Sequence, residues 1–329
     1  IHDAKQESID TILEMAEHKK DGKCKALIVS GCLAHRYHDE IEKEIPEVDA
    51  LLGTASYDKI AEVVLSVLEG KGYSCIDDAD RLVMTKDERI ITTGGYYEYL
   101  KIAEGCDKHC TYCIIPKVRG NYRSYPMEYL VKQAEQLAEK GVKELILVAQ
   151  ETTVYGVDIY GKKMLAELVK KLAAIKDIAW IRILYCYPEE IDDALIEVIK
   201  NEPKVCHYLD MPIQHASDSI LKKMGRRTTK QELKDVINKL RENIPDIALR
   251  TTLITGFPGE TQKDHEEMLD FVDEMEFDRL GVFTYSPEED TPAAVMPGQI
   301  DEEVKEQRRD AVMELQQEVS LDKSEEMVG

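Results

Sequence analysis

The sequence contains no long apolar run. Its longest apolar stretches, such as Leu145–Ala149, cover five residues, far fewer than the roughly 18 that a membrane-spanning helix needs. The chain also lacks the basic, apolar and small-residue order of a secretory signal, and it begins with Ile1 instead of a methionine. These absences predict a soluble, cytoplasmic protein that binds no membrane, with further residues expected upstream of Ile1.

Positive charge is also scarce. Lys and Arg together number 43 against 65 Asp and Glu, which gives a formal net charge of −22 and a pI of about 4.9. A field of that sign repels phosphate backbones, so broad nonspecific binding to nucleic acid is excluded, although a local basic patch is not. No Gly-Lys-Ser/Thr sequence follows the turn Gly256–Gly259, which excludes a phosphate-binding loop of the nucleotide-hydrolase type.

Structural disulfides are not expected, because cytosolic thiols are kept reduced. The eight cysteines are unevenly spaced along the chain: Cys24, Cys32, Cys75, Cys106, Cys110, Cys113, Cys186 and Cys206. Three of them fall within eight residues, a spacing that indicates a metal or catalytic site. Away from this cluster, the four cysteines predicted to be inert core residues are Cys24, Cys75, Cys186 and Cys206.

From residue 95 onward, short β-branched runs alternate regularly with amphipathic helical patterns. The predicted strands are 98–104, 144–149, 179–184, 207–211, 248–255 and 279–284. The predicted helices are 126–139, 161–175, 189–200, 217–223, 230–243 and 261–276. Six βα units predict an α/β fold whose parallel sheet forms an open, partial (β/α)6 barrel. The functional loops of such sheets lie at the carboxyl ends of the strands.

The first part of the chain is organised differently. The predicted elements there are a helix over 1–21, a strand over 26–30, a helix near 36–45, a loop over 46–54 and a helix over 57–68. This order predicts the remnant of a small α/β domain. We therefore expect the remnant at residues 1–75, a charged, glycine-containing linker at 76–95 and the barrel at 96–325, ending in a charged helix over 301–317.

The predicted strand 98–104 leads directly into a CxxxCxxC loop formed by Cys106, Cys110 and Cys113. Three closely spaced thiolates can bind three irons of a 4Fe–4S cluster and leave the fourth iron open to a small molecule. A zinc site would need a fourth ligand, and His109 inside the loop is expected to point away from the metal. A zinc knuckle completed by a distant Cys or His is the competing interpretation.

This loop, with Tyr112 before its last cysteine, resembles that of the radical S-adenosylmethionine (radical SAM) superfamily. Within the superfamily, several segments are similar to the methylthiotransferase family: Gly31–Tyr37, Glu104–Cys106, Ile114–Gly120, Ala149–Thr152, Gln214–Ser217 and Thr255–Thr261. Three further segments resemble the members that methylthiolate an aspartate of a ribosomal protein more than those that modify tRNA: Gln150–Asp158, Tyr208–His215 and Lys222–Arg227.

The resemblance implies two clusters and S-adenosylmethionine as cofactors. Cys106, Cys110 and Cys113 would bind the barrel cluster. Cys32 is similar to the third ligand of a second 4Fe–4S cluster, whose first two ligands would precede Ile1, because Asp3–Ser8 resembles the segment that follows the second ligand. The family's carboxyl-terminal OB-type (TRAM) domain is also expected to be absent after Gly329. The second cluster is therefore expected to be incomplete in this chain.

The resemblance further implies a methylthiotransferase that modifies the β-carbon of an aspartate in the small-subunit ribosomal protein bordering the decoding centre. An acidic surface would attract a basic ribosomal protein and resist tRNA. The implied partners are that ribosomal protein or the ribosome, and an electron donor such as flavodoxin or ferredoxin. The alternatives are methylthiolation of a tRNA adenosine, or a noncatalytic iron–sulfur or zinc module that binds the ribosome.

Other strand-end residues are candidates for the S-adenosylmethionine pocket. By resemblance, Gln150 and Glu151 lie where the methionine moiety binds, and Gln214 and Ser217 lie in the ribose-contacting segment. A polar turn at Gln150 and Glu151, and a helix N-cap at Ser217, are the competing interpretations.

Three more residues complete the predicted pocket. Arg182 and Arg250 lie within strands, where a guanidinium is costly unless it is paired, so each is either a carboxylate clamp or half of a structural ion pair. Gly256 would let the backbone approach the adenine, or it simply forms a strand-to-helix turn. No side chain is assigned as a catalytic acid or base.

Overall fold

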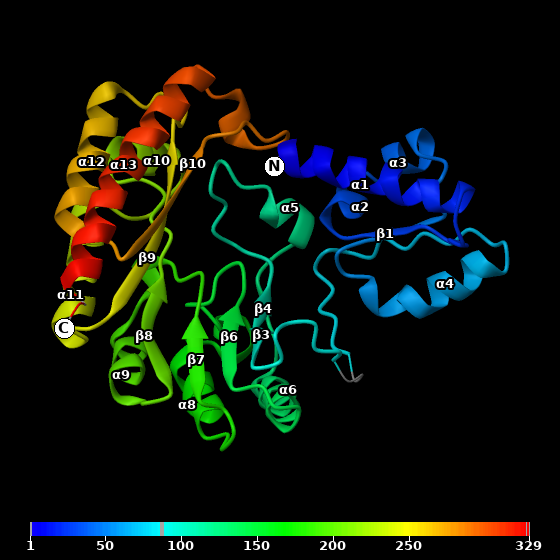
Figure 1. The fold of residues 1–329 in the computed structure, drawn as a ribbon, viewed down its shortest axis with the longest axis horizontal. Helices are drawn as coiled ribbons and strands as arrows, with labels where there is room; N and C mark the ends of the chain where they lie inside the picture. Colours follow the sequence, from blue (N-terminus) through cyan, green and yellow to red (C-terminus); the bar gives the residue numbers. More distant parts are fainter. Residues whose placement is uncertain (1, 86–88, 327, 329) are drawn as a thin grey trace. The chain divides into compact units, whose positions relative to one another are not determined.

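The computed structural model describes residues 2–85, 89–326 and 328 (Figure 1). The chain divides into two compact units. The first comprises Ile1–Asp87, Glu104–Asp107 and Ile114–Arg123, and the second comprises Glu88–Ala103, Lys108–Cys113 and Ser124–Gly329. Residues 86–88 of the predicted linker lie outside the described residues. The two units are considered separately below.

The first unit contains a two-stranded parallel sheet with helices packed on it. Its elements are α1 (His2–Lys20), β1 (Ile28–Ser30), α2 (Cys32–Arg36), α3 (His38–Glu44), β2 (Ala50–Leu52), the 3₁₀ turn Tyr57–Lys59, α4 (Ile60–Leu68) and α5 (Ile115–Arg119). Ile28 pairs with Ala50 and Ser30 with Leu52. The predicted helix near 36–45 is two helices that meet at Tyr37.

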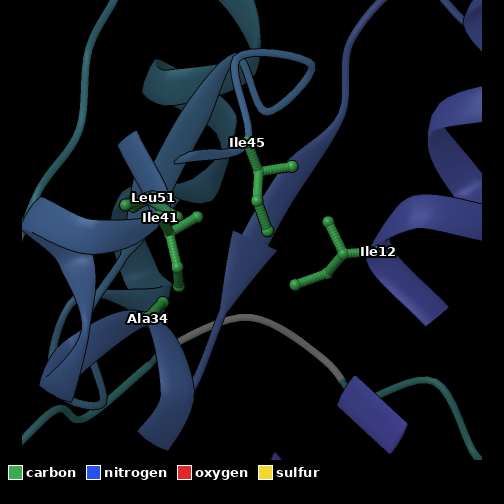
Figure 2. Close-up of a cluster of buried hydrophobic side chains, with 5 residues drawn as sticks. All are labelled: Ile12, Ala34, Ile41, Ile45 and Leu51. Carbon is green, nitrogen blue, oxygen red and sulfur yellow. The ribbon is translucent and has the colours of Figure 1, made fainter. Parts of the chain in front are cut away.

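The core of the first unit explains why a strand occurs inside the predicted loop 46–54. Figure 2 shows Ile12, Ala34, Ile41, Ile45 and Leu51 gathered in one buried cluster. On the other face of β2, a second cluster contains Ala50, Leu52, Val63 and Cys75. The loop prediction was wrong here because β2 is only three residues long and is buried on both faces, so it carries no alternating pattern.

The second unit confirms the partial barrel. Its strands are β3 (Tyr97–Lys101), β6 (Glu144–Val148), β7 (Trp180–Ile183), β8 (Val205–Asp210), β9 (Ala248–Thr255) and β10 (Arg279–Thr284). They form one sheet in the order β10-β9-β8-β7-β6-β3, and every neighbouring pair is parallel. Since β3 and β10 lie at opposite edges, the sheet is open. The short strands β4 (Ala103–Glu104) and β5 (Arg123–Ser124) flank the cysteine loop in sequence.

Helices follow the strands of this sheet along the chain, and several of them pack against it. They are α6 (Met127–Glu139), α7 (Val157–Tyr160), α8 (Leu165–Ala173), α9 (Asp193–Asn201), α10 (Asp218–Lys223), α11 (Lys230–Asn243), α12 (Gln262–Met275) and α13 (Glu302–Glu326), with 3₁₀ turns at Pro188–Glu190 and Pro292–Val295. Figure 1 shows α6, α8 and α9 beside β3, β7 and β8. The connection lengths therefore match repeated βα units.

Local sequence signals fix where several helices begin. Thr229 and Thr261 each form a capping box, with Glu232 and Asp264 respectively, so α11 and α12 start one residue after these threonines. The final helix is longer than predicted: it continues to Glu326, and it packs against β9 and β10. Within the described residues, no helix combines the length and the apolar character needed to cross a membrane.

Candidate functional site

The cysteine loop begins in the first unit with a turn that only glycine can make. Gly105 has φ +79°, and a Cβ atom there would overlap the carbonyl oxygen of Asn121. The backbone N–H of Cys106 donates to the carbonyl of Gly120 at 3.2 Å, and Asp107 accepts from the N–H of Tyr122 at 2.9 Å. The first part of the loop is therefore held against the segment that follows α5.

The second part of the loop, Lys108–Cys113, belongs to the second unit and is held by Thr111. The Thr111 N–H donates to the carbonyl of Met224 at 2.9 Å, and its hydroxyl donates to the carbonyl of Lys223 at 2.8 Å. The Thr111 carbonyl accepts from the N–H of Ala293 at 2.9 Å. Residues more than a hundred positions away thus fix the conformation of this part of the loop.

None of the three cysteines of the loop forms a disulfide in the described structure. Cys106 and Cys110 are buried, and Cys113 is partly buried. No group of three or more His, Cys, Asp or Glu among the described residues could hold a metal ion. That result concerns one shared ion, whereas the thiolates of a 4Fe–4S cluster each bind a different iron. The donor set, three closely spaced thiols of one CxxxCxxC segment that form no disulfide, therefore fits such a cluster.

The Cys110 thiol has a polar neighbourhood that the sequence did not reveal. Its Sγ lies 3.0 Å from the hydroxyl of Tyr187, and the guanidinium of Arg226 lies 3.9 Å from the centre of the Tyr187 ring. The predicted pocket residue Tyr112 packs edge-on against Phe257. Arg226 lies in the segment Lys222–Arg227, which sequence reasoning used only as a family signature.

Gln150 and Glu151 follow β6, as predicted. Glu151 is buried, and its Oε1 accepts hydrogen bonds from the N–H and the hydroxyl of Thr153. The other carboxylate oxygen has no hydrogen-bond partner within the described structure, and the Lys108 ammonium lies 4.0 Å from it. Burial raises the pKa of Glu151 to about 7, although Thr153 and Lys108 oppose the shift. This carboxyl group can therefore exchange a proton near neutral pH.

Gln214 adopts a strained backbone conformation after β8. Its φ is +72°, in the left-handed region that non-glycine residues rarely occupy. Its N–H donates to the carbonyl of Thr252 at 2.9 Å, and its carbonyl accepts from the N–H of Ile254 at 2.8 Å. Two hydrogen bonds to β9 hold this geometry. The turn therefore has a defined position at the carboxyl ends of the strands.

Ser217 occupies the N-cap position of α10, but its side chain makes no capping bond. Its hydroxyl donates to Asp264 at 2.5 Å. Burial acts to raise the pKa of Asp264, but hydrogen bonds from Ser217, Ser219 and Thr261 outweigh it and lower that pKa. The hydroxyl of Ser217 therefore joins the start of α10 to the start of α12, which corrects the N-cap interpretation.

The two predicted arginines are both paired. Arg182 on β7 donates to Glu144 at 2.7 Å, and Arg250 on β9 donates to Asp210 at 3.2 Å. Arg182 also lies over the ring of Tyr208. Of the two interpretations offered by the sequence, the ion pair describes both residues in this structure.

Gly256 begins a turn that the last helix holds in place. It has φ +71°, and a Cβ atom there would overlap the side chain of Lys305 on α13. Glu260, at the end of the turn, is fully buried and accepts from Arg308 at 3.0 Å. Two buried cations of α13 therefore fix the turn, and neither was identified from the sequence. The sequence of α13 is highly charged and indicates a solvated helix, so nothing in it marked Lys305 and Arg308 as buried.

Another buried polar group behind this turn was missed. His215 is completely buried, its Nδ1 accepts from the N–H of Ser217 at 2.9 Å, and its Nε2 lies 3.5 Å from Glu260. The Nε2 atom makes no hydrogen bond within the described structure.

The remaining cysteines differ in burial. Cys32, at the start of α2, is exposed, while Cys75 and Cys186 are buried as predicted for core residues. Cys24 and Cys206 are only partly buried, which corrects that prediction for these two. Burial raises the pKa of Cys186, so its thiol stays protonated.

Family models match two parts of the chain. The model described as "Radical SAM superfamily" matches residues 100–272, and the one described as "Uncharacterized protein family UPF0004" matches residues 1–53. Solved structures agree in fold. The radical S-adenosylmethionine methyltransferase TsrM from Kitasatospora setae is 14% identical with a TM-score of 0.64, over 86% of this chain and 61% of that chain. The cobalamin-dependent enzyme OxsB is 14% identical with a TM-score of 0.57, over 95% of this chain and 46% of that chain.

Curated relatives are much more similar. A protein of Lachnoclostridium phytofermentans named ribosomal protein uS12 methylthiotransferase RimO is 66% identical over 329 residues, which cover 100% of this chain and 75% of that protein. A protein of the same name from Clostridioides difficile is 53% identical, over 100% of this chain and 74% of its own length. The chain therefore belongs to the radical SAM superfamily and, within it, to the family of RimO ribosomal protein uS12 methylthiotransferases.

Proposed function

We propose that this radical SAM methylthiotransferase binds its 4Fe–4S cluster through Cys106, Cys110 and Cys113 and attaches a methylthio group to the β-carbon of an aspartate in ribosomal protein uS12, at the decoding centre. One observation supports the cluster assignment: three cysteines in CxxxCxxC spacing, none of them in a disulfide, follow the first strand of an open parallel sheet. The names of the relatives support uS12 as the substrate.

The protein contributes binding and orientation. When bound, the cluster supplies the electron that cleaves S-adenosylmethionine, and so provides a radical able to remove hydrogen from an unactivated C–H bond. No side-chain base is strong enough to remove that hydrogen as a proton. The unpartnered oxygen of Glu151 is suited to accept a hydrogen bond from the amino group of the methionine moiety. The rigid turn at Gln214 would present a fixed surface to the ribose.

The proposed S-adenosylmethionine contacts are Tyr112, Gln150, Glu151, Arg182, Gln214, Ser217, Arg250 and Gly256. In this assignment Arg182 and Arg250 contact S-adenosylmethionine while each stays paired with its carboxylate partner. We also propose Cys32 as one ligand of a second 4Fe–4S cluster, with sulfur held there and methyl supplied by a second S-adenosylmethionine. Its exposed thiol is accessible for that role.

The net negative charge of the chain supports a basic ribosomal protein as partner. A net charge of −22 favours association with a basic protein over tRNA. The proposed partners are thus uS12 or the ribosome, and flavodoxin or ferredoxin as the electron donor. The proposed modification of a ribosomal protein also supports a cytoplasmic location.

A competition assay tests this proposal. The natural full-length protein is reconstituted with iron and sulfide and given S-adenosylmethionine, a reductant, and equal amounts of uS12 and tRNA. Mass spectrometry should find a methylthio group on an aspartate of uS12 and none on tRNA. Methylthiolated adenosine would instead establish the tRNA activity. A metal-loaded protein that forms no 5′-deoxyadenosine would establish a noncatalytic module.

A further inference from the structure

Resting on the cluster site proposed above, we infer that Tyr187 and Arg226 form a buried pair that sets the charge environment of the Cys110 thiolate and raises the reduction potential of the cluster it binds. The two residues touch neither substrate nor iron in this assignment. They are positioning residues that act through the sulfur of Cys110.

The contact between Tyr187 and Cys110 has a defined direction once the cysteine is a ligand. The Tyr187 oxygen lies 3.0 Å from the Cys110 sulfur, and either atom could donate in the free thiol. A thiolate has no proton, so Tyr187 must then be the donor. Hydrogen bonds to cluster sulfurs stabilise the more negative, reduced state, because reduction adds one electron to a group that is already anionic. This bond therefore makes reduction easier.

Arg226 is a buried cation whose ion pair with Glu189 is long. Its side chain is 1% exposed. One terminal nitrogen donates to the carbonyl of Pro212 at 3.1 Å, and the carboxylate of Glu189 is 3.7 Å away, beyond hydrogen-bond range. The Arg226 Nε has no hydrogen-bond partner in the described part of the chain. A buried guanidinium left in this state is costly, and an anionic cluster would supply the missing charge.

The arrangement also connects Arg226 to the cluster loop. The guanidinium lies over the ring of Tyr187, whose hydroxyl reaches Cys110. The segment just before Arg226 is bonded to the loop through Thr111, which donates to the carbonyls of Lys223 and Met224. These bonds hold the backbone next to Arg226 against the loop, and the bond from the guanidinium to the carbonyl of Pro212 orients the side chain.

Lys108 is the other cation near Tyr187, 4.9 Å from its ring centre. It forms an ion pair with Glu190, which also binds Lys163 at 2.8 Å. Glu190 partly cancels the charge of Lys108, whereas the Glu189 carboxylate lies 3.7 Å from Arg226 and cancels less of its charge. Arg226 is therefore the cation chosen for the test.

The test is a redox titration of the reconstituted chain, followed by electron paramagnetic resonance, with iron and sulfide content measured on the same samples. At a fixed donor potential, Arg226→Met should lower the ratio of reduced to oxidised cluster about tenfold, which is about 59 mV for a one-electron couple. Tyr187→Phe should lower it about threefold. Arg226→Lys, which keeps the charge, should recover most of the loss.

Two matched variants control for general damage. Tyr155→Phe removes a buried hydroxyl that donates to a backbone carbonyl, and Arg241→Met removes a guanidinium that binds carbonyls at the end of α12. Neither should change the ratio. Tyr187→Phe decides the question if Arg226→Met fails to fold.

Full iron content with an unchanged or raised ratio in Tyr187→Phe and Arg226→Met would overturn the inference. Failure of the underlying cluster site is a separate result: the parent chain would then bind no cluster, or Cys110→Ala would bind as much iron as the parent.

Discussion

Cys110 and Cys32 both lie in segments that follow a short parallel strand, but the protein treats them differently. Cys110 is buried, touches Tyr187, and sits in a loop bonded to Met224 and Ala293. Cys32 is exposed at the start of a five-residue helix, and the adjacent Gly31 is bonded only to neighbouring strand and helix residues. The difference indicates that the second unit surrounds Cys110 with fixed, buried groups, whereas the Cys32 thiol on α2 is exposed to solvent.

The largest effect should come from removing a thiol of the anchored kind. Cys110→Ala removes a proposed cluster ligand, so iron content should fall to about a tenth or less, and 5′-deoxyadenosine formation should be lost. Cys186→Ala is the matched control, because it removes another buried thiol at the cost of packing alone, on the order of 1–2 kcal/mol. Iron analysis and product assay measure both. Similar losses in the two variants would erase the distinction between ligand and core cysteines.

Glu151 tests how desolvated the neighbourhood of the anchored loop is. Its folded-state pKa of about 7 lies above the ordinary value of 4.5, so folding takes up a proton, and the parent loses stability as pH rises between these values. Glu151→Gln removes this loss. We expect little difference from the parent below about pH 4.5, and a relative gain for the variant on the order of 3 kcal/mol at pH 8, measured by denaturant unfolding.

Glu190→Gln is the control of opposite sign. Burial acts to raise the pKa of Glu190, but bonds from Lys108 and Lys163 lower it. This variant should be less stable than the parent at pH 8, and the difference should shrink as the pH falls below the ordinary value. If the stability difference between Glu151→Gln and the parent does not depend on pH, the Glu151 carboxyl group is solvated. The contrast between buried surroundings at Cys110 and exposed surroundings at Cys32 would then be weaker.

A smaller effect should follow from loosening the loop without touching a thiol. Thr111→Val removes the hydroxyl bond to Lys223 and keeps the backbone bond to Met224, a loss of about 1 kcal/mol. Iron release to a chelator should accelerate several-fold. Thr111→Ser, which retains the hydroxyl, should release iron at the parental rate. Equal rates in all three proteins would show that these anchors do not protect the cluster.

The smallest effect is expected at the exposed cysteine. Cys32→Ala should change the unfolding free energy of this chain by less than about 0.5 kcal/mol, because an exposed thiol makes few contacts. Iron bound to this chain should stay constant, because a single thiolate does not hold a cluster. A loss of iron from this chain would mean that Cys32 already binds a cluster here.

Most of the fold could be predicted from local patterns. The six strands of the sheet were found because each is a short run that contains β-branched, leucine or aromatic residues between turn signals. The observed starts of α11 and α12 lie next to capping threonines. β2 was missed because a strand of three residues, buried on both faces, has no periodicity. The end of α13 at Glu326 was missed because a highly charged helix lacks a clear stop signal.

The candidate site was only half predictable. The spacing of Cys106, Cys110 and Cys113 is local, so it is visible in the sequence. Tyr187 contacts Cys110 across 77 positions, and Arg226 lies further still along the chain. Nothing in the residue types around Arg226 marks it as buried, because Arg is mostly exposed in proteins. Such contacts form only when the strands assemble into the sheet, so they can be found only in the three-dimensional structure.

The bonds of Thr111 also bear on the order in which the protein matures. Its partner Ala293 follows it by about 180 residues, so at translation rates of 5–20 residues per second the two are synthesised roughly 10–40 s apart. Throughout that interval the thiols of Cys110 and Cys113 lie in a loop that has not yet gained its last anchor. Iron and sulfide delivered to the growing chain would meet an unanchored loop, whereas delivery after synthesis of β10 and the turn that follows it would meet a preformed one.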